Sequence, residues 1–122
     1  GTMAEQIVYP KTELPQDFRE ISDLLAKVGL AHLRPEQGGV EQLSRADVQR
    51  LCLARVLHHR PVLALLDDAL TGLPEAERER ACDLLRESRV AFVSTGSDPD
   101  AAKHHTHVVH LTNGEQSEEE EE

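Results

Sequence analysis

Two short apolar runs separated by a helical stretch limit the fold of this 122-residue chain more than any other feature of its sequence. The first run covers residues 62–66 and ends in the paired acids Asp67 and Asp68, and the second covers residues 90–94. Continuous apolar runs of strand length are typical of parallel strands covered on both faces. A strand, a helix and a second strand in succession favour a right-handed crossover unit. We therefore expect an α/β fold in which these two strands are parallel neighbours.

Helix signals lie between and before the two runs. Ser44 is a good N-cap residue for a helix predicted over residues 45–59. Pro74 can occupy the first turn of the helix between the two strands, which is expected to run to about residue 87. Apolar residues at helical spacing predict an earlier helix over residues 16–28. The chain should therefore carry three helices, two of them ahead of the sheet.

The two ends of the chain carry weaker signals. Residues 6–10 are predicted to be extended or loop-like, and residues 106–111 are predicted to form a third strand. Residues 113–122 are expected to form a disordered acidic tail, because a run of like charges repels itself. Six of the 23 acidic residues lie in this tail, which leaves 17 acidic against 13 basic residues in the body. The body is therefore only mildly acidic.

Composition excludes several classes of protein. Tyr9, Phe18 and Phe92 are the only aromatic residues apart from histidine, so base stacking on aromatic side chains is not expected and no nucleic-acid partner is predicted. Cys52 and Cys82 are thirty residues apart, a spacing that favours a reduced setting over a disulfide framework or a zinc site. No apolar stretch is long enough to cross a bilayer, so direct membrane insertion is not expected.

Several short stretches, in this order along the chain, resemble the second half of an ATP-binding cassette (ABC) ATPase domain. The likeness is greatest to the subfamily D transporters, which are peroxisomal and of the fatty-acyl type, and to their bacterial relatives. It covers residues 1 to about 112. The stretches are Glu-Gln-Ile-Val-Tyr-Pro at 5–10, His-Arg-Pro at 59–61, Ala-Leu-Leu-Asp at 64–67 and Lys-His-His-Thr-His at 103–107.

The resemblance implies a partial P-loop NTPase core with parallel strands plus a helical subdomain. Residues 1–60 would form the helical subdomain, and residues 61–112 the Walker B side of the α/β core. Residues near 5–10 and 37–41 would lie where nucleotide binding is coupled to a transmembrane partner. No Gly-x-x-x-x-Gly-Lys-Ser/Thr stretch occurs in the chain, so it has no phosphate-cradling loop of its own. We therefore expect a carboxyl-terminal fragment of the domain, with no nucleotide turnover by itself.

The stretch Leu-Ser-Arg-Ala-Asp-Val-Gln-Arg at 43–50 stands where the family has its signature motif, usually Leu-Ser-Gly-Gly, two variable residues and Gln-Arg. By resemblance, Ser44, Arg45 and Gln49 would contact a nucleotide bound to a second nucleotide-binding domain. Arg45 and Ala46 replace the two glycines and add Cβ atoms at that contact, although a guanidinium can itself meet phosphate oxygens. The alternative is that Ser44 is merely an N-cap.

Residues 62–68 stand at the Walker B position. By resemblance, Asp67 would bind Mg²⁺ and Asp68 would be the catalytic base that polarises the attacking water. Asp68 replaces the usual Glu with a side chain one methylene shorter, so hydrolysis should be slow. The alternative is that both acids are simply solvated. Two further positions depart from the family pattern: Pro74 at the end of the D-loop, and Ser97 at the switch loop, where histidine is usual.

These observations support two hypotheses. In the first, the chain is part of a transporter domain at the cytoplasmic face of a membrane, soluble as a fragment, and the full-length domain uses ATP and Mg²⁺ at a degenerate site. Its partners would be a transmembrane domain and a second nucleotide-binding domain. In the second, the chain is a nucleotide-independent protein interaction module that keeps only the fold. Without the strand that carries the phosphate loop, we expect residues 106–111 to pair with residues 90–94 of the same chain; the alternative is that two chains pair their strand edges.

Overall fold

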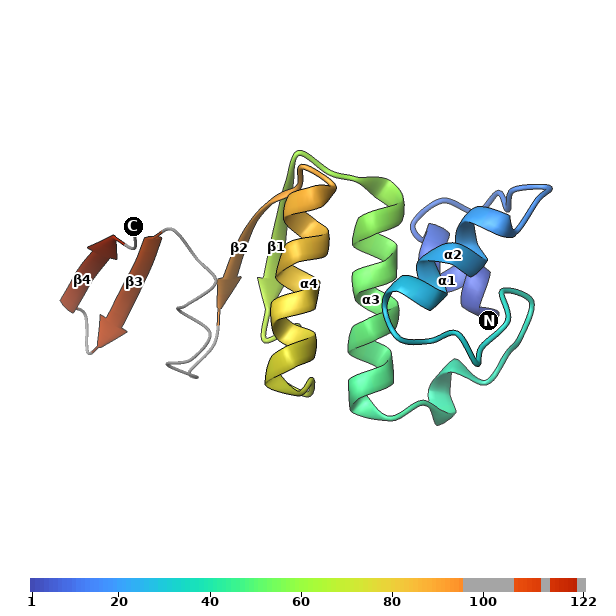
Figure 1. Cartoon of the computed structure of the whole chain (residues 1–122), viewed down its shortest axis with the longest axis horizontal. Helices are drawn as coiled ribbons and strands as arrows, with labels where there is room; N and C mark the ends of the chain where they lie inside the picture. The colour runs from blue at the N-terminus through green and yellow to red at the C-terminus, as the bar shows by residue number, and fades with distance from the viewer. Residues whose placement is uncertain (96–106, 113–114, 121–122) are drawn as a thin grey trace.

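The computed structural model describes residues 1–95 and the backbone of residues 107–112 and 115–120 (Figure 1). Helices and strands follow each other along the chain, with a first helical part and a later part that contains the strands. In chain order the elements are α1 (Met3–Val8), α2 (Arg19–Lys27), the 3₁₀ helix η1 (Val40–Gln42), α3 (Arg45–His59), β1 (Leu63–Asp67), α4 (Glu75–Glu87), β2 (Ala91–Thr95), β3 (His107–Thr112) and β4 (Glu115–Glu120).

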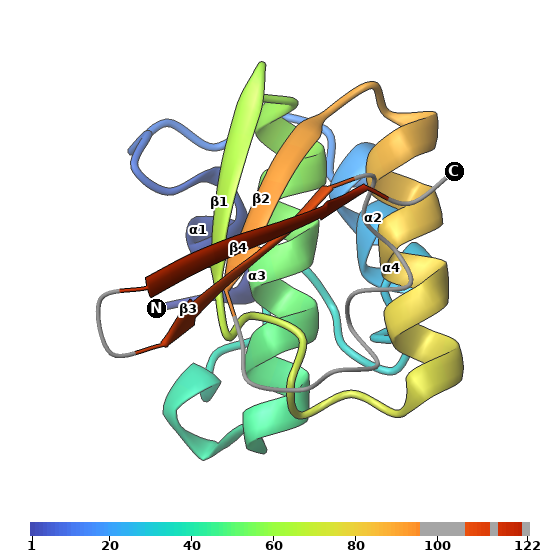
Figure 2. The same ribbon diagram turned by 90° about the vertical axis from the view of Figure 1, so that its left-hand side faces the viewer.

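The predicted strand, helix, strand unit is confirmed. β1 pairs with β2 in parallel, with Leu63 opposite Ala91 at one end and Asp67 opposite Thr95 at the other. α4 connects the two strands, and α3 and α4 lie on the same face of the sheet (Figures 1 and 2). The protein is therefore a mixed α/β structure whose two-stranded parallel sheet is compatible with part of an ABC ATPase core.

The prediction that both faces of these strands are covered is wrong. Along β1, Ala64 and Leu66 are buried, whereas Leu63 is 53% and Leu65 is 77% exposed. Val93, the neighbour of Leu65 on β2, is 54% exposed. The helices cover only the face that carries Ala64 and Leu66, and side chains alternate between the two faces of a strand. One face of the β1–β2 sheet is therefore apolar and accessible to solvent.

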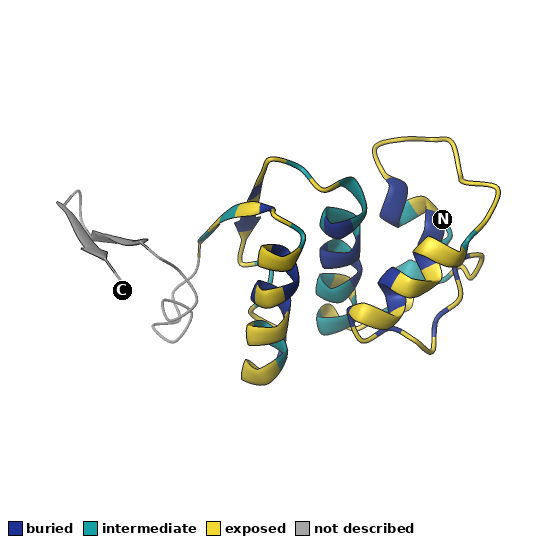
Figure 3. Cartoon of the chain, turned by 45° about the horizontal axis from the view of Figure 1, so that its top comes forward, coloured by how far each residue is buried: buried dark blue, intermediate teal, exposed yellow. Residues whose placement is uncertain are grey.

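The helical part has its own buried core. Figure 3 shows α3 lined with buried and half-buried residues, whereas one side of α4 is exposed. α1 and α2 both pack on α3. The largest side chains that are almost completely inaccessible come from α1, α2, α4 and the loop after α2, and they are Met3, Ile7, Ile21, Leu25, Leu30, Cys82 and Leu85.

Residues 6–10 were predicted to be extended or loop-like, and this is wrong for residues 6–8, which belong to α1. The helix begins with a capping box, in which Thr2 Oγ1 accepts a hydrogen bond from the Glu5 amide and a Glu5 carboxylate oxygen accepts one from the Thr2 amide. Such reciprocal bonds satisfy two of the free amides at a helix start. The helix buries Ile7 and Val8, which a strand pattern would have placed on opposite faces.

The other helix predictions are confirmed with small shifts. α2 begins at Arg19 rather than at residue 16, and the Arg19 amide donates to Asp17 Oδ1 at 2.9 Å. Ser44 is the N-cap of α3, and its Oγ accepts from the Asp47 amide at 3.1 Å. Pro74 precedes α4 as its N-cap instead of lying within the first turn.

The expected pairing of the third strand is wrong. β3 pairs with β4 in an antiparallel sheet and not with β2, so each sheet of the described residues has two strands. Residues 115–120, expected in a disordered tail, form β4. Thr112 stands opposite Glu115, and the Asn-Gly dipeptide between them is one that two-residue hairpin connections prefer. A partner two residues away costs less loop-closure entropy than one across the connection from β2.

Candidate functional site

The two acids predicted at the Walker B position lie at the carboxyl end of β1. Asp67 is the last residue of the strand, and its Oδ1 accepts a hydrogen bond from Thr95 Oγ1 at 2.5 Å. Thr95 is the last residue of β2 and stands opposite Asp67 in the sheet register. Both acids are exposed. Carboxylate oxygens at such an edge are the ligand type that Mg²⁺ prefers, so the donor set fits the predicted cation.

Asp68 is held through its backbone. Its φ is 50°, in the left-handed region that aspartate tolerates better than most residues. The Asp68 amide donates to the Thr95 carbonyl oxygen at 3.2 Å. The Asp68 carbonyl oxygen accepts from Gln49 Nε2 at 3.1 Å and from Thr71 Oγ1 at 3.0 Å. The chain therefore leaves the sheet at Asp68 with a well-defined backbone direction and an exposed carboxylate.

Gln49 joins α3 to this turn. Besides the bond to Asp68, its Nε2 donates to Thr71 Oγ1 at 3.3 Å, and its Oε1 accepts from the Gly72 amide at 2.7 Å. A Cβ atom on residue 72 would lie 2.9 Å from Gln49 Oε1, so glycine is the residue that allows this close approach. The Gln49 side chain is engaged with its own chain, a role that the sequence did not predict.

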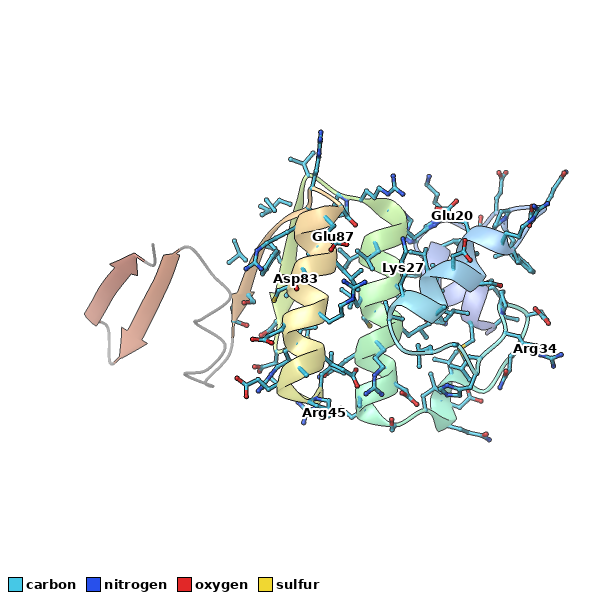
Figure 4. The ribbon with its side chains drawn as sticks, in the orientation of Figure 1. Glu20, Lys27, Arg34, Arg45, Asp83 and Glu87 are labelled. Atoms are coloured by element: carbon cyan, nitrogen blue, oxygen red, sulfur yellow. The ribbon has the colours of Figure 1, made fainter. Side chains whose placement is uncertain are left out.

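Arg45 and Ser44 lie at the same end of α3. Arg45 Nη2 donates to Thr71 Oγ1 at 3.0 Å, so a second side chain from α3 reaches the loop after β1. Figure 4 shows Arg45 at the end of α3 that faces the start of α4. Ser44 caps α3, which is the structural role that the sequence predicted for it. The structure thus brings Ser44, Arg45 and Gln49 to the same end of the molecule as Asp68.

An ion-pair cluster that sequence reasoning missed connects α3 to α4. Arg50 Nε and Nη2 donate to the two carboxylate oxygens of Glu77, each at 2.8 Å, and Arg50 Nη1 donates to Asp47 Oδ1 at 2.6 Å. The hydrogen bonds from Arg50 lower the pKa of Glu77, and the two carboxylates raise the pKa of Arg50. The i, i+3 spacing of Asp47 and Arg50 on one helix face could have predicted their ion pair. Glu77 is 27 residues from Arg50 in the sequence, so no local pattern predicts that contact.

One of the two stretches expected at the coupling region, residues 37–41, is bonded to the start of the helix that runs into the other. The Met3 amide donates to the Gln37 carbonyl oxygen at 2.9 Å, so the start of α1 is bonded to the second stretch. The end of α1 is tied to α3, because Arg55 Nε donates to the Gln6 carbonyl oxygen at 2.7 Å and His59 Nε2 lies 2.7 Å from the Tyr9 carbonyl oxygen. The guanidinium of Arg55 also lies 5.1 Å from the centre of the Tyr9 ring.

The other features considered in the sequence add no residue to this site among those that the structure describes. Within the residues that the structure describes, no group of three or more His, Cys, Asp or Glu side chains could hold a metal ion. No helix in the described part of the chain is long and apolar enough to cross a membrane. Ser97, expected at the switch loop, lies outside the described residues. Cys52 and Cys82 are both free, and burial raises the pKa of Cys82.

The chain is similar to known ABC proteins, although no family model matches it. It is 30% identical to the lysosomal cobalamin transporter ABCD4 of Mus musculus, over 93% of this chain and 21% of the transporter. It is 26% identical to ATP-binding cassette sub-family D member 3 of Mus musculus, over 91% of this chain and 19% of that protein. An uncharacterized ABC transporter ATP-binding protein of Synechocystis is 30% identical, over 91% of this chain and 18% of its own length.

The chain thus spans about a fifth of the length of these relatives. The likeness extends over more than nine tenths of the chain. It confirms the resemblance that the short stretches indicated. The chain is a homologue of the ABC transporters of subfamily D and of a bacterial ABC ATP-binding protein.

Proposed function

We propose that the chain is the carboxyl-terminal part of the nucleotide-binding domain of an ABC transporter and carries its signature and Walker B elements. The observation that supports this most is the junction between α3 and the end of β1. There Gln49 and Arg45 hold the turn that follows Asp68. The start of α3, which would contact the nucleotide of the second nucleotide-binding domain, is thereby bonded to the turn after β1. The end of β1 would serve the nucleotide bound to its own domain.

In this proposal, Asp67 is a ligand of Mg²⁺ and Asp68 is the base that polarises the attacking water. Ser44 and Arg45 face a nucleotide bound to a second nucleotide-binding domain, and Ser97 takes the place of the switch histidine. Gln49 positions the loop of residues 68–72. ATP binding requires the phosphate loop of another part of the domain, and bound ATP with Mg²⁺ supplies the phosphoryl group for transfer.

The site is proposed to be degenerate. The Asp68 carboxylate is one methylene shorter than the usual glutamate, which moves a base away from its water. Arg45 adds a side chain where the family usually has glycine, and that guanidinium donates to Thr71. We therefore expect the domain to bind ATP better than it hydrolyses it. A transmembrane domain of the same transporter, at the cytoplasmic face of a membrane, is its proposed partner.

The exposed sheet face supports the proposal from packing. Leu63, Leu65 and Val93 present apolar side chains to solvent on the side opposite the helices. Burying such a side chain contributes about 1.5–3 kcal/mol. A further part of the nucleotide-binding domain that packs on this face would gain that free energy. The α/β unit is thus proposed to be completed by the part that carries the phosphate loop.

A chimera tests this proposal. The segment of the Synechocystis relative that aligns with this chain is replaced by the chain, and Mg²⁺-ATP binding and hydrolysis are measured. We expect nucleotide binding that Asp67→Asn weakens, with slow hydrolysis that Asp68→Glu raises by an order of magnitude or more, within the usual contribution of a general base. Asp23→Asn, at an exposed acid on α2, is the matched control and should leave both unchanged. A folded chimera that binds no nucleotide would overturn the proposal.

A further inference from the structure

A cavity of about 380 Å³ lies at the other end of the helices from the Asp68 turn. It is open to solvent and lies among the carboxyl-terminal ends of α2, α3 and α4. Lys27 is the last residue of α2, Arg60 is the C-cap of α3, and Arg89 follows the C-cap of α4. All three line the cavity, together with three leucines, Ser88 and Glu87. Figure 4 labels Lys27 at the end of α2 and Glu87 at the end of α4.

These cations differ from the others in the described part of the chain. Most described Lys and Arg side chains have an acid, hydroxyl or carbonyl partner. Among the described residues, the side chains of Lys11, Lys27, Arg60 and Arg89 have neither an ion pair nor a hydrogen bond, and three of these four line this one cavity. The chain as a whole has a formal charge of −10. An unpaired positive cluster is therefore unusual on this protein.

Of the three cations, only Arg60 affects the pKa of the neighbouring His58, as the smallest of several causes. Burial lowers the pKa of His58 most, His59 lowers it next, and the positive charges of Lys11 and Arg60 lower it further, while the nearby carboxylate of Glu20 opposes the shift. The one acid that lines the cavity, Glu87, is engaged with Arg80, whose Nη1 lies 3.6 Å from Glu87 Oε1. The cavity thus carries three cations against one partly neutralised carboxylate.

Helix stabilisation alone does not account for this arrangement. A cation at the carboxyl end of a helix is favoured by the helix dipole by about 0.3–1 kcal/mol, and all three cations lie at such ends. Arg60 and Arg89 have φ values of 48° and 59°, in the left-handed region where glycine and asparagine are preferred. A side chain other than these is disfavoured there by roughly 1–2 kcal/mol. Local backbone preference therefore does not select arginine at two of the three positions.

We propose that this cavity binds a small multivalent anion that carries phosphate or carboxylate groups. Its volume is within the usual range for small-molecule sites, about 300–1,000 Å³. Guanidinium groups such as those of Arg60 and Arg89 match the oxygen geometry of phosphate and carboxylate, and Lys27 adds a point charge. Leu24, Leu57 and Leu84 are buried and form an apolar wall, next to which charged contacts are screened less than in open water. The site is separate from the proposed nucleotide site.

The test is calorimetric titration of the full chain with pyrophosphate and, separately, with citrate, at constant ionic strength set with sodium chloride. Saturable binding of either anion supports the proposal, and the tighter of the two identifies the preferred group. Arg60→Asn and Arg89→Asn remove the charge but keep a residue that tolerates the left-handed backbone. Each should weaken binding by about tenfold, the loss of one charge-assisted contact.

Arg34→Gln is the matched control, because Arg34 is an exposed cation in the loop after α2, away from the cavity. It should leave the affinity unchanged. Glu87→Gln should tighten binding, an effect that loss of folding cannot imitate. The absence of saturable binding of both anions would overturn the proposal. So would equal weakening by Arg34→Gln and Arg60→Asn, since it would show only general attraction to surface charge.

Discussion

The helical part and the sheet of this protein differ in how completely they bury their apolar side chains. In the helical part, α1 and α2 pack on α3, and Ile7, Ile21 and Leu25 are inaccessible to solvent. In the sheet, β1 buries Ala64 and Leu66 on one face and exposes Leu65 on the other. The helical part thus has its own core, whereas the sheet shares a core on one side only. The difference indicates which surface another part of a larger domain would cover.

The largest effect is expected from two leucine truncations, one in each region. Leu25→Ala should destabilise the chain by about 2–5 kcal/mol, because it removes buried methyl groups and leaves a cavity. Leu65→Ala removes a side chain that is 77% exposed and should change stability by less than about 0.5 kcal/mol. Urea unfolding of both variants measures the contrast. Equal destabilisation would show that the outer sheet face is covered.

The second largest loss of stability is expected when the ion-pair cluster of Arg50 is removed. Arg50→Met removes the contacts with Asp47 and Glu77 and should cost about 1–2 kcal/mol, reduced from the usual range for charged hydrogen bonds because Glu77 is partly exposed. Arg34→Met, at an exposed pair, should cost nearly nothing. Chemical denaturation compares them. Similar costs for the two variants would mean that the α3–α4 contact adds no stability.

The loop after β1 allows a double-mutant test of similar size. Gly72→Ala places a Cβ 2.9 Å from Gln49 Oε1, so the amide must shift, and we expect a loss of about 1 kcal/mol. In a Gln49→Ala background the same change should cost much less, since the crowded atom is gone. A coupling energy of at least about 0.5 kcal/mol in the cycle is expected. Additive effects would mean that Gln49 does not hold this loop.

A cap substitution should have a comparable or smaller effect. Ser44→Ala removes the oxygen that accepts from the Asp47 amide, with an expected cost of about 1 kcal/mol. Ser44→Asp, which can accept the same bond, should restore most of the stability. Thermal unfolding followed by circular dichroism measures both. If the aspartate variant is as unstable as the alanine variant, the cap is not the source of the loss.

The smallest effect concerns pH. Arg50 lowers the pKa of Glu77 from its ordinary value of 4.5, so the pair stabilises the folded chain fully above that value. As pH falls below 4.5, the unfolded chain takes up a proton first, and this stability is lost through the folded pKa. Glu77→Gln should therefore flatten the acid side of the stability profile. A profile identical to that of the unchanged chain would contradict the assignment.

Local sequence signals predicted the elements that depend on local chemistry. The Ser44 cap, the α4 helix and the parallel β1–β2 pair were all correct because short-range patterns and the handedness rule determine them. α1 was missed because its apolar residues at 3, 4, 7 and 8 were not matched to a helix period, and its signal was the spacing of Thr2 and Glu5. The predicted partner of β3 was wrong because the apolar pattern of residues 106–111 is compatible with pairing to β2 as well as to β4.

The candidate site was predicted in part for the same reason. The positions of Asp67 and Asp68 follow from the end of an apolar run. The bonds from Gln49 to Asp68 and Gly72 join residues 19 and 23 apart, and only the packing of α3 against the sheet brings them together. An apolar run also cannot reveal whether something lies over it. The exposure of Leu65 could therefore not be predicted from the sequence.

The central claim is that the outer face of the β1–β2 sheet is apolar, open in this chain and covered in a complete nucleotide-binding domain. Hydroxyl-radical footprinting, read by mass spectrometry, tests it directly at Leu65 and Leu66. In the isolated chain, oxidation should be fast at Leu65 and slow at Leu66; in the chimera with the Synechocystis relative, Leu65 should become protected. Slow oxidation at Leu65 in the isolated chain, or unchanged fast oxidation in a folded chimera, would contradict the claim.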